Sequence, residues 1–405
     1  MNMLARVRQR LVIIGNGMAG AMAMEEILAR SPGLFNITVF GAEPHGSYNR
    51  ILLSPVLAGE LAFADIVTHA PAWYTANGVE LISGEAVVEI DRSARIVRGE
   101  RGTIRQYDLL LLATGSDPVV LPIPGADLPG VFRFRDIADV DAMRAASATS
   151  QRAVVVGGGL LGLEAAHGLC RNGMSVTVVH LMPGLMERQL DAVSASLLAQ
   201  AVKARGIAVV TSASTAAVLG DDRVSGVALA DGRALPADIV VMAAGTRPRI
   251  ALARAAGLDC GRGVRVDDAM RTSDPFIHAI GECAEHEGVV VGLVAPIRDM
   301  ARVFARHAAG ECAAQYAPAV AGTHLKVSGI DTFSAGDFLG DDTTEAISFR
   351  DIAHGVHRRL VLRHDRLVGI AMVGDARDSG WYFDLLRRGA DVSAMRNTLA
   401  FGAAA

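Results

Sequence analysis

Two regions of the chain repeat one pattern of apolar and polar positions. Residues 11–20 are an apolar run, L-V-I-I, followed by G-N-G-M-A-G, and residues 153–162 are A-V-V-V followed by G-G-G-L-L-G. Short apolar runs predict buried parallel strands, and the alanine-rich segment after each glycine turn predicts a helix. Another apolar run follows each predicted helix, at Ile37–Phe40 and Ser175–Val179. The pattern therefore predicts one strand–turn–helix–strand unit that is present twice.

A second pair of matching segments extends the duplication. Leu109–Leu112 is an apolar run that leads into small residues, and Ile239–Met242 does the same. Prolines after each run mark connections between domains. We therefore predict an α/β fold with two Rossmann-like dinucleotide-binding domains, the second inserted into the first. The first domain is expected at residues 1–118 and 247–318, and the second at residues 119–246.

The C-terminal residues, 319–405, contain no third copy of the glycine-rich turn. We predict a small α+β domain here, with a hairpin turn at His364–Arg366. The expected elements are strands at Leu325–Ile330, Glu345–Arg350, Arg359–Arg363 and Leu367–Val373, and a helix at Trp381–Arg388.

Composition narrows the classes of function. The chain has 405 residues, of which 51% are hydrophobic and 43 are glycine, as in globular α/β proteins. A net charge of −4 gives no reason to expect nucleic-acid binding. No apolar run approaches the roughly 18 residues that indicate a membrane-spanning helix. The basic segment Met1–Arg10 leads into a short strand and not into the apolar core of a signal peptide. We therefore expect a cytoplasmic protein that binds neither nucleic acid nor membrane.

Cysteine spacing argues against a metal centre. No two cysteines form the C-x-x-C pair that is usual for iron–sulfur and zinc ligands, so we expect no metal site. We interpret Cys283 as a packed, inert thiol. The histidines at positions 354, 357 and 364 lie in a basic stretch that we interpret as a solvated face. The cysteines are Cys170, Cys260, Cys283 and Cys312.

The glycines of the first turn have separate roles in nucleotide binding. Gly15 allows a tight turn, Gly17 lets a pyrophosphate approach the backbone, and Gly20 lets the helix pack closely on the strand. The N-terminus of the helix then faces the phosphates. Glu43, just beyond the second strand, is the best candidate to accept hydrogen bonds from ribose hydroxyls.

The second copy lacks an acid at the corresponding position. His180 and Leu181 follow the strand there. A carboxylate would favour NADH and an arginine would favour NADPH, so the choice of coenzyme stays open. Glu187 and Arg188 lie near this end of the unit, and we interpret them as residues that cap or solvate a loop.

Several longer segments resemble a known family. They are Tyr48–Glu60, His180–Asp191, Gly281–His286, Lys326–Gly329 and Trp381–Leu386. Together with the glycine turns, they resemble FAD-dependent NAD(P)H oxidoreductases. These enzymes have two dinucleotide-binding domains and belong to a superfamily like that of the pyridine nucleotide-disulfide reductases. The resemblance covers essentially the whole chain. It is most specific to the flavoprotein part of assimilatory NAD(P)H nitrite reductase large subunits and to nitrate reductase electron-transfer subunits.

The resemblance implies roles for individual residues. Arg50 would contact the flavin pyrophosphate, and Glu282 would bind a ribityl hydroxyl where aspartate is commoner. Related reductases pair a lysine with the glutamate at the position of Glu164, but this chain has Pro55 where that lysine would stand. Glu164, with its partner open, is the one catalytic candidate. Pro296 would begin a helix, running through residue 308, whose N-terminus points at the flavin.

The motifs and the resemblance together define a candidate cofactor site for FAD and for NADH or NADPH. The candidate cofactor-binding residues are Gly15, Gly17, Met18, Ala19, Gly20, Glu43, Arg50, Ala113, Thr114, Gly115, Gly157, Gly159, Gly162, Glu164, Gly245, Gly281, Glu282 and Pro296.

The function implied by the resemblance is electron transfer from NAD(P)H through FAD to a separate redox protein in assimilatory nitrite or nitrate reduction. That partner would be an iron–sulfur protein, a ferredoxin-like protein or a catalytic subunit, and a homodimer is left open. One alternative is a rubredoxin- or ferredoxin-type reductase, against which Pro55 weighs. An alternative of another class is a nucleotide-binding redox sensor or regulatory subunit without turnover.

Two further expectations concern the acceptor. The chain has no cysteines spaced for iron–sulfur or sirohaem domains and stops at Ala405, so we expect it not to reduce nitrite itself and expect this to be its natural end. Between Arg350 and Arg388 there are eight arginines and five aspartates. That excess would either steer an acidic partner or form an ordinary surface.

Overall fold

The computed structural model describes residues 8–311, 313–327 and 329–403. The chain divides into two compact units. The first comprises Met1–Leu52, Phe63–Asp117 and Thr246–Ala319, and the second comprises Leu53–Ala62, Pro118–Gly245 and Val320–Ala405. In the described part of the chain, no helix combines the length and the apolar character needed to cross a membrane.

The first unit is built on a parallel sheet of five strands, in the order β21-β9-β1-β2-β5. Its strands are β1 (Gln9–Ile14), β2 (Phe35–Gly41), β5 (Val79–Ser83), β9 (Leu109–Leu112) and β21 (Ile277–Ala279). Helices α1 (Met18–Arg30) and α9 (Val294–Ala308) contact each other and cover one face, against Leu11, Ile13 and Leu111. The alternate residues Val12, Ile14 and Leu110 pack on the other face, as the two-residue period of a strand requires.

Smaller elements complete this unit. They are β3 (Ser47–Tyr48), β4 (Val67–His69), β6 (Val87–Asp91), β7 (Ile96–Gly99), β8 (Ile104–Gln106), β10 (Ser116–Pro118), β19 (Thr246–Pro248), β20 (Val264–Val266), β22 (Ala284–His286), β23 (Val289–Val290), α3 (Phe63–Ile66), α4 (Pro71–Ala76), α8 (Ala251–Ala255) and the 3₁₀ turns Arg50–Leu52 and Gly281–Cys283. The antiparallel sheet β6-β7-β8 supplies Ile90 and Val97 to the core behind the main sheet.

The second unit repeats the arrangement with a parallel sheet in the order β11-β18-β12-β13-β14. The strands are β11 (Val131–Phe132), β12 (Arg152–Val156), β13 (Ser175–Val179), β14 (Ala208–Val210) and β18 (Ile239–Met242). The helices are α2 (Leu53–Leu57), α5 (Ile137–Ser147), α6 (Leu160–Arg171) and α7 (Ala192–Ala204). An antiparallel sheet of β15 (Thr215–Leu219), β16 (Gly226–Leu229) and β17 (Ala234–Pro236) packs on the main sheet through Val218 and Val227.

Residues 53–62 group with the second unit, although we expected the first domain to run unbroken to residue 118. Gly168 on α6 explains the grouping, because the Leu57 side chain fills the space that a Cβ at this glycine would need. In addition, the Asn172 amide donates a hydrogen bond to the Leu57 carbonyl oxygen at 3.0 Å. The division into three domains stays a prediction.

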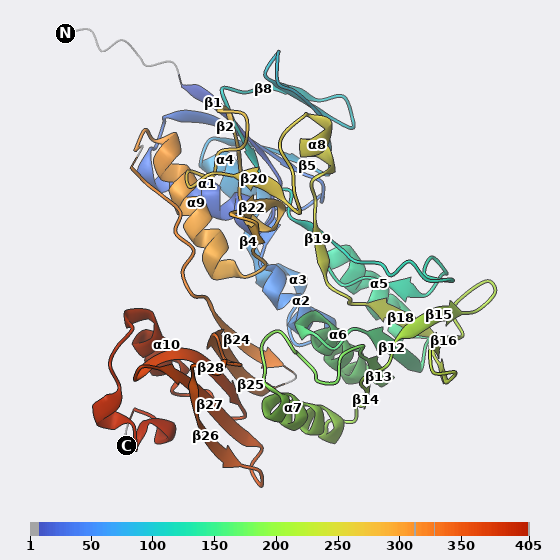
Figure 1. Cartoon of the computed structure of the whole chain (residues 1–405). Coiled ribbons are helices and arrows are strands. Elements are labelled where there is room, and N and C mark those ends of the chain that lie inside the picture. Colours follow the sequence, from blue (N-terminus) through green and yellow to red (C-terminus); the bar gives the residue numbers. More distant parts are fainter. Residues whose placement is uncertain (1–7, 312, 328, 404–405) are drawn as a thin grey trace. The chain divides into compact units, whose positions relative to one another are not determined.

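Residues 320–403 form an antiparallel sheet in the order β24-β25-β28-β27-β26, covered by helix α10 (Ser379–Arg388) (Figure 1). The strands are β24 (Gly322–Val327), β25 (Ile330–Gly336), β26 (Glu345–Asp351), β27 (Val356–Arg363) and β28 (Arg366–Val373). The expected hairpin turn is confirmed, because His364 and Asp365 both have positive φ angles, as a tight two-residue turn requires.

Two expectations in this part of the chain are wrong. The strand expected at Leu325–Ile330 is split by a hairpin turn, in which Val327 pairs with Ile330 and Gly329 has a φ of +76°. Ser328 lies outside the described residues. The side chain of His357, expected on a solvated face, is fully buried.

His357 is buried because it joins the C-terminal sheet to α7. Its Nε2 lies 3.5 Å from Oδ2 of Asp191, the N-cap residue of α7, and its Nδ1 lies 3.1 Å from the Phe349 carbonyl oxygen. Burial alone would raise the pKa of Asp191, but hydrogen bonds from His357 and Ser194 lower it to about 2. The contact between α7 and strands β27 and β28 explains why residues 320–405 group with the second unit.

The glycine turns make matching close contacts in the two units. Gly15 and Gly157 have positive φ angles, and a Cβ on either would overlap a backbone carbonyl oxygen, of Ala113 in the first unit and of Ala243 in the second. A Cβ on Gly20 or Gly162 would overlap the carbonyl oxygen of the first glycine in its own turn. Backbone therefore lies directly on backbone at both turns.

Replacing the first glycine of the second turn should destabilise the fold much more than replacing its third residue. We expect Gly157→Ala to lower the free energy of unfolding by about 3 kcal/mol or more, from the positive φ and the carbonyl overlap. Gly159→Ala is the matched control, because Gly159 has no described atom within 4 Å of the added methyl. Thermal unfolding of both variants tests this, and equal losses would contradict it.

Candidate functional site

The first glycine turn leaves the start of α1 open to a ligand. Gly17 is the N-cap residue, and a Cβ built on it would lie 3.9 Å from the guanidinium of Arg50. The first N–H groups of a helix have no partners within the helix, and the helix dipole adds positive potential there. The turn and Arg50 therefore fit an anionic pyrophosphate.

The structure brings Arg50 and Glu43 together beside this turn. The Arg50 Nη2 pairs with Oε1 of Glu43, and the Tyr48 hydroxyl donates to Oε2 of Glu43 at 2.6 Å. About a quarter of each charged side chain in the pair remains exposed. A carboxylate has about four acceptor positions, so Glu43 can hold Arg50 in place and still accept from ribose hydroxyls.

A second group of predicted residues meets at the carboxyl ends of β9 and β21. Ala113-Thr114-Gly115 follows β9, and the Ser116 hydroxyl donates to Oε2 of Glu282 at 2.5 Å. Gly281 has a φ of +79°, and a Cβ on it would lie 2.8 Å from the Cβ of Ala19 at the start of α1. Strand ends and helix start therefore converge around Glu282.

Helix α9 begins two residues before Pro296, at Val294. The prediction that Pro296 opens this helix is therefore slightly wrong, but proline is still accommodated in the first turn, where no intrahelical N–H bond is lost. Met300 on α9 accepts a hydrogen bond from the Gly281 N–H through its sulfur at 3.4 Å. The helix is thus tied to the Gly281–Cys283 turn.

Taken together, the residues of the first unit fit FAD. The cradle at Gly17 accommodates a pyrophosphate that a side chain at this position would crowd, and Arg50 supplies a positive charge there. Glu43 and Glu282 offer carboxylate oxygens that can accept from hydroxyl groups.

Cys283 takes no part in this arrangement. Its side chain is fully buried, and its thiol donates to the carbonyl oxygen of Ile280 at 3.2 Å. Burial raises the pKa of the thiol, which favours the unreactive protonated form. The prediction of a packed cysteine is confirmed.

The second glycine turn has the same open form. Gly159 is the N-cap residue of α6, with no described atom within 4 Å of an added Cβ. Gly245, beyond the end of β18, has a φ of +104°. The turn therefore has the room and the free helix start that a second dinucleotide needs.

Glu164 on α6 has an uncharged partner. The Ser54 hydroxyl donates to its Oε2 at 2.7 Å, from the residue just before Pro55. Burial raises the pKa of Glu164 to about 7, although the Ser54 hydrogen bond opposes the shift. Sequence reasoning left the partner of Glu164 open, and Ser54 is the residue it missed. The carboxyl group is therefore poised between its protonated and ionised forms at neutral pH.

Comparison with known families agrees with this geometry. The family model of pyridine nucleotide-disulphide oxidoreductases matches residues 9–306, and that of the rubredoxin NAD⁺ reductase C-terminal domain matches residues 322–390. The chain belongs to the pyridine nucleotide-disulphide oxidoreductase family. Enzymes of this family depend on FAD and NAD(P)H, so both cofactor predictions are confirmed.

Individual relatives narrow the comparison within the pyridine nucleotide-disulphide oxidoreductases. The chain is 46% identical to nitrite reductase [NAD(P)H] of Bacillus subtilis over 95% of its length, and 42% identical to the assimilatory nitrate reductase electron transfer subunit of the same organism over 97%. It spans about half the length of these relatives, 48% and 51%. A covalent putidaredoxin reductase–putidaredoxin complex contains a chain with the same fold, with a TM-score of 0.86, 25% identity and coverage of 95% and 94% of the two chains.

The protonation of Glu164 predicts a pH-dependent stability. The folded pKa of about 7 lies above the unfolded value, so the contribution of Glu164 to stability is fully present below about pH 4.5 and is lost as the pH rises through 7. Glu164→Gln removes the ionisation and should raise the free energy of unfolding relative to the unchanged protein, by up to about 3 kcal/mol more at about pH 8 than at about pH 5.

Calorimetry of the FAD-loaded protein at both pH values measures this difference. The control is Glu89→Gln, which alters an exposed glutamate paired with Arg98. A stability gap for Glu164→Gln that does not change with pH would show that the carboxyl group ionises normally.

Proposed function

We propose that the chain takes electrons from NADH or NADPH and passes them through FAD to a separate redox protein. The observation that carries the proposal is the pair of open glycine turns, each at the start of a helix and each in its own unit. The Arg50–Glu43 pair lies beside the first turn, which supports FAD in the first unit and the pyridine nucleotide in the second.

When bound, FAD accepts two electrons from a reduced pyridine nucleotide and can release them one at a time. The residues of the first unit act by binding and orienting: α1 and Arg50 hold the pyrophosphate, while Glu43 and Glu282 accept from hydroxyl groups. Electron transfer of this kind requires no protein acid or base, so positioning supplies most of the rate.

Glu164 remains our candidate catalytic residue. It lies on the helix that starts at the second glycine turn, and the nucleotide is assigned to that turn. Its carboxyl group, with a pKa of about 7, can hold a proton on one oxygen while the other accepts from Ser54. A protonated carboxyl can donate a hydrogen bond to a polar group of the bound nucleotide.

The relatives support a role in assimilatory nitrite or nitrate reduction, which we propose takes place in the cytoplasm. One is named as a nitrite reductase and another as a nitrate reductase electron transfer subunit. The reductase–putidaredoxin complex supports a separate iron–sulfur or ferredoxin-like protein, or a catalytic subunit, as the acceptor. A homodimer remains open.

Charge steering gives this docking little support. Arg363 and Arg377 pair with Asp341 and Asp375, and Arg358 is buried against Tyr382. Arg359 and Arg366 donate to nearby carbonyl oxygens. These five arginines are therefore held by local contacts, and the net excess between residues 350 and 388 is too small to give a strong field.

A rubredoxin-type reductase is the second candidate function. The observation in its favour is the match of residues 322–390 to the rubredoxin NAD⁺ reductase C-terminal domain. The two candidates share the reductive half of the reaction and differ in the acceptor protein.

Anaerobic mixing with each coenzyme tests the proposal. We expect NADH or NADPH to bleach the visible absorbance of the bound flavin rapidly, because the bound nucleotide is held for electron transfer. Gly159→Val is the matched control: it should stay folded and yellow but bleach slowly, since its side chain would occupy the space at the second turn.

Flavin that stays oxidised with both coenzymes would contradict the proposal and favour a sensor or regulatory subunit. The chain alone should reduce an artificial one-electron acceptor but consume no nitrite. Nitrite consumption by the purified chain would contradict the assignment of a separate acceptor protein.

A further inference from the structure

The position after β13, where a ribose-binding acid usually stands, is occupied by a histidine that faces inward. The Gly158 N–H donates to Nδ1 of His180 at 3.0 Å, and His180 is almost fully buried. Because Nδ1 accepts, the neutral imidazole carries its proton on Nε2. His180 therefore cannot accept a hydrogen bond from a ribose hydroxyl through Nε2.

An acid nevertheless reaches this place from farther along the chain. The carboxylate Oε2 of Glu187 lies 2.9 Å from Nε2 of His180, the nitrogen that carries the proton. A continuous hydrogen-bonded path thus runs from the glycine turn at Gly158 through the imidazole to Glu187. His180 is a positioning residue that holds this carboxylate beside the nucleotide turn.

The backbone of the loop fixes Glu187 as well. The N–H of Met186 donates to the Gly158 carbonyl oxygen at 3.0 Å, and Met186 has a φ of +54°. The N–H groups of Gln189 and Leu190 return to the Met186 carbonyl oxygen at 2.8 and 2.9 Å. Leu185 and Met186 are buried, whereas about a third of the Glu187 side chain is exposed. The carboxylate is therefore held in place but open to a ligand.

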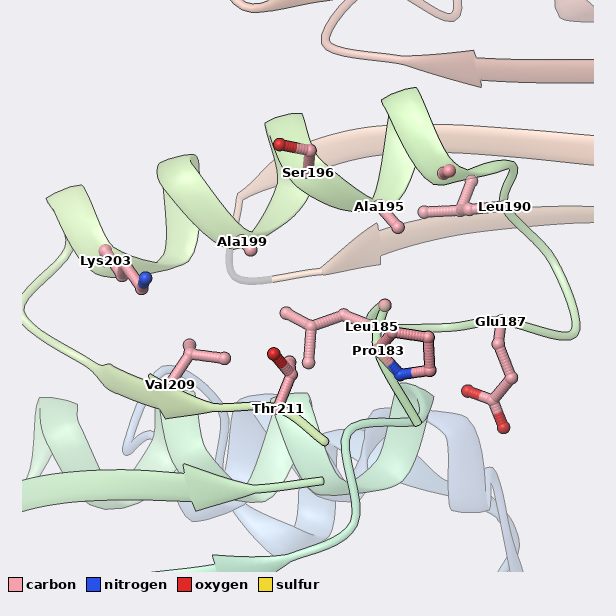
Figure 2. A pocket seen from close by; sticks show the side chains of 12 residues that line it. Pro183, Leu185, Glu187, Leu190, Ala195, Ser196, Ala199, Lys203, Val209 and Thr211 are labelled. Carbon is pink, nitrogen blue, oxygen red and sulfur yellow. The ribbon is translucent and has the colours of Figure 1, made fainter. Parts of the chain in front are cut away.

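Glu187 also lies at the edge of a pocket of about 400 Å³. Thr211, which follows β14, and Pro183 and Leu185, in the loop after β13, line it together with α7 (Figure 2). The pocket lies between α7 and the edge strand β14, whose Val209 also lines it, and Glu187 lies at its edge in the loop that follows β13. Figure 2 shows Lys203 and Glu187 at opposite ends of it.

We propose that Glu187 accepts the hydroxyl groups of the adenosine ribose and makes the chain select NADH over NADPH. The inference rests on the proposed function and names its coenzyme. A carboxylate can accept from both ribose hydroxyls, whereas it repels the 2′-phosphate of NADPH. Arg188, the next residue in the chain, is exposed. If Arg188 and not Glu187 determined the choice of coenzyme, the chain would prefer NADPH.

The test measures binding without turnover. Calorimetric titration of the FAD-loaded full chain with ADP-ribose and with 2′-phospho-ADP-ribose gives the two dissociation constants. We expect ADP-ribose to bind at least about 10-fold more tightly. Glu187→Gln should weaken ADP-ribose binding about 10- to 100-fold and bring the two constants close together, because it removes the charge. His180→Ala should also reduce the ratio of the two dissociation constants. The titration of this variant uses protein that is shown to be folded.

Two control variants separate the explanations. Asp222→Asn removes an exposed charge from the same unit and should leave the ratio unchanged. A ratio unchanged in Glu187→Gln, or a preference for the 2′-phosphate form that Arg188→Gln abolishes, would overturn the assignment of Glu187. If neither compound binds to protein with a full content of FAD, the proposed function itself fails.

Discussion

The architecture depends on direct contact between backbone segments at the two glycine turns. Gly15 lies against the carbonyl oxygen of Ala113, and Gly157 lies against that of Ala243 in the same way. With no Cβ at these positions, the helix that follows each glycine turn can begin immediately above the ends of the parallel strands. The unpartnered N–H groups of the helix then face a space that a phosphate can enter. The capacity to bind a dinucleotide therefore follows from the same contacts that hold helix and sheet together.

Much of this framework is predictable from sequence because it is local. A short apolar run and a fixed glycine spacing specify the strand, the turn and the helix, and the repeat of that spacing predicts two copies. Strand predictions of this kind fail where a tight turn falls inside a short run of apolar residues. The apolar residues Leu325, Val327 and Ile330 predict one strand, yet Val327 pairs with Ile330 across a turn that contains Gly329. The prediction that His357 lies on a solvated face is wrong because its burial depends on Asp191, which is far away in the sequence.

The partners of the site residues were less predictable. Glu43 and Arg50 were assigned separate roles, and only the fold shows that they pair. Ser54 with Glu164 and Ser116 with Glu282 are hydroxyl–carboxylate contacts between distant segments, and serine carries no distinctive sequence signal. The surroundings also shift the pKa values of two acids in opposite directions. Glu164, with a neutral partner, has a pKa of about 7, whereas Asp191, beside His357, has one of about 2. Neither value follows from residue type alone.

The central claim is that the two glycine turns bind different nucleotides. Amide hydrogen exchange on the full chain tests it most directly, with the protein first free of FAD, then loaded with FAD, and then loaded with FAD and ADP-ribose. The account predicts that FAD slows exchange around residues 15–20 and 281–283, and that ADP-ribose then slows exchange around residues 157–163 and 180–188. Protection of the second turn by FAD, or protection of the first turn by ADP-ribose, would contradict the assignment.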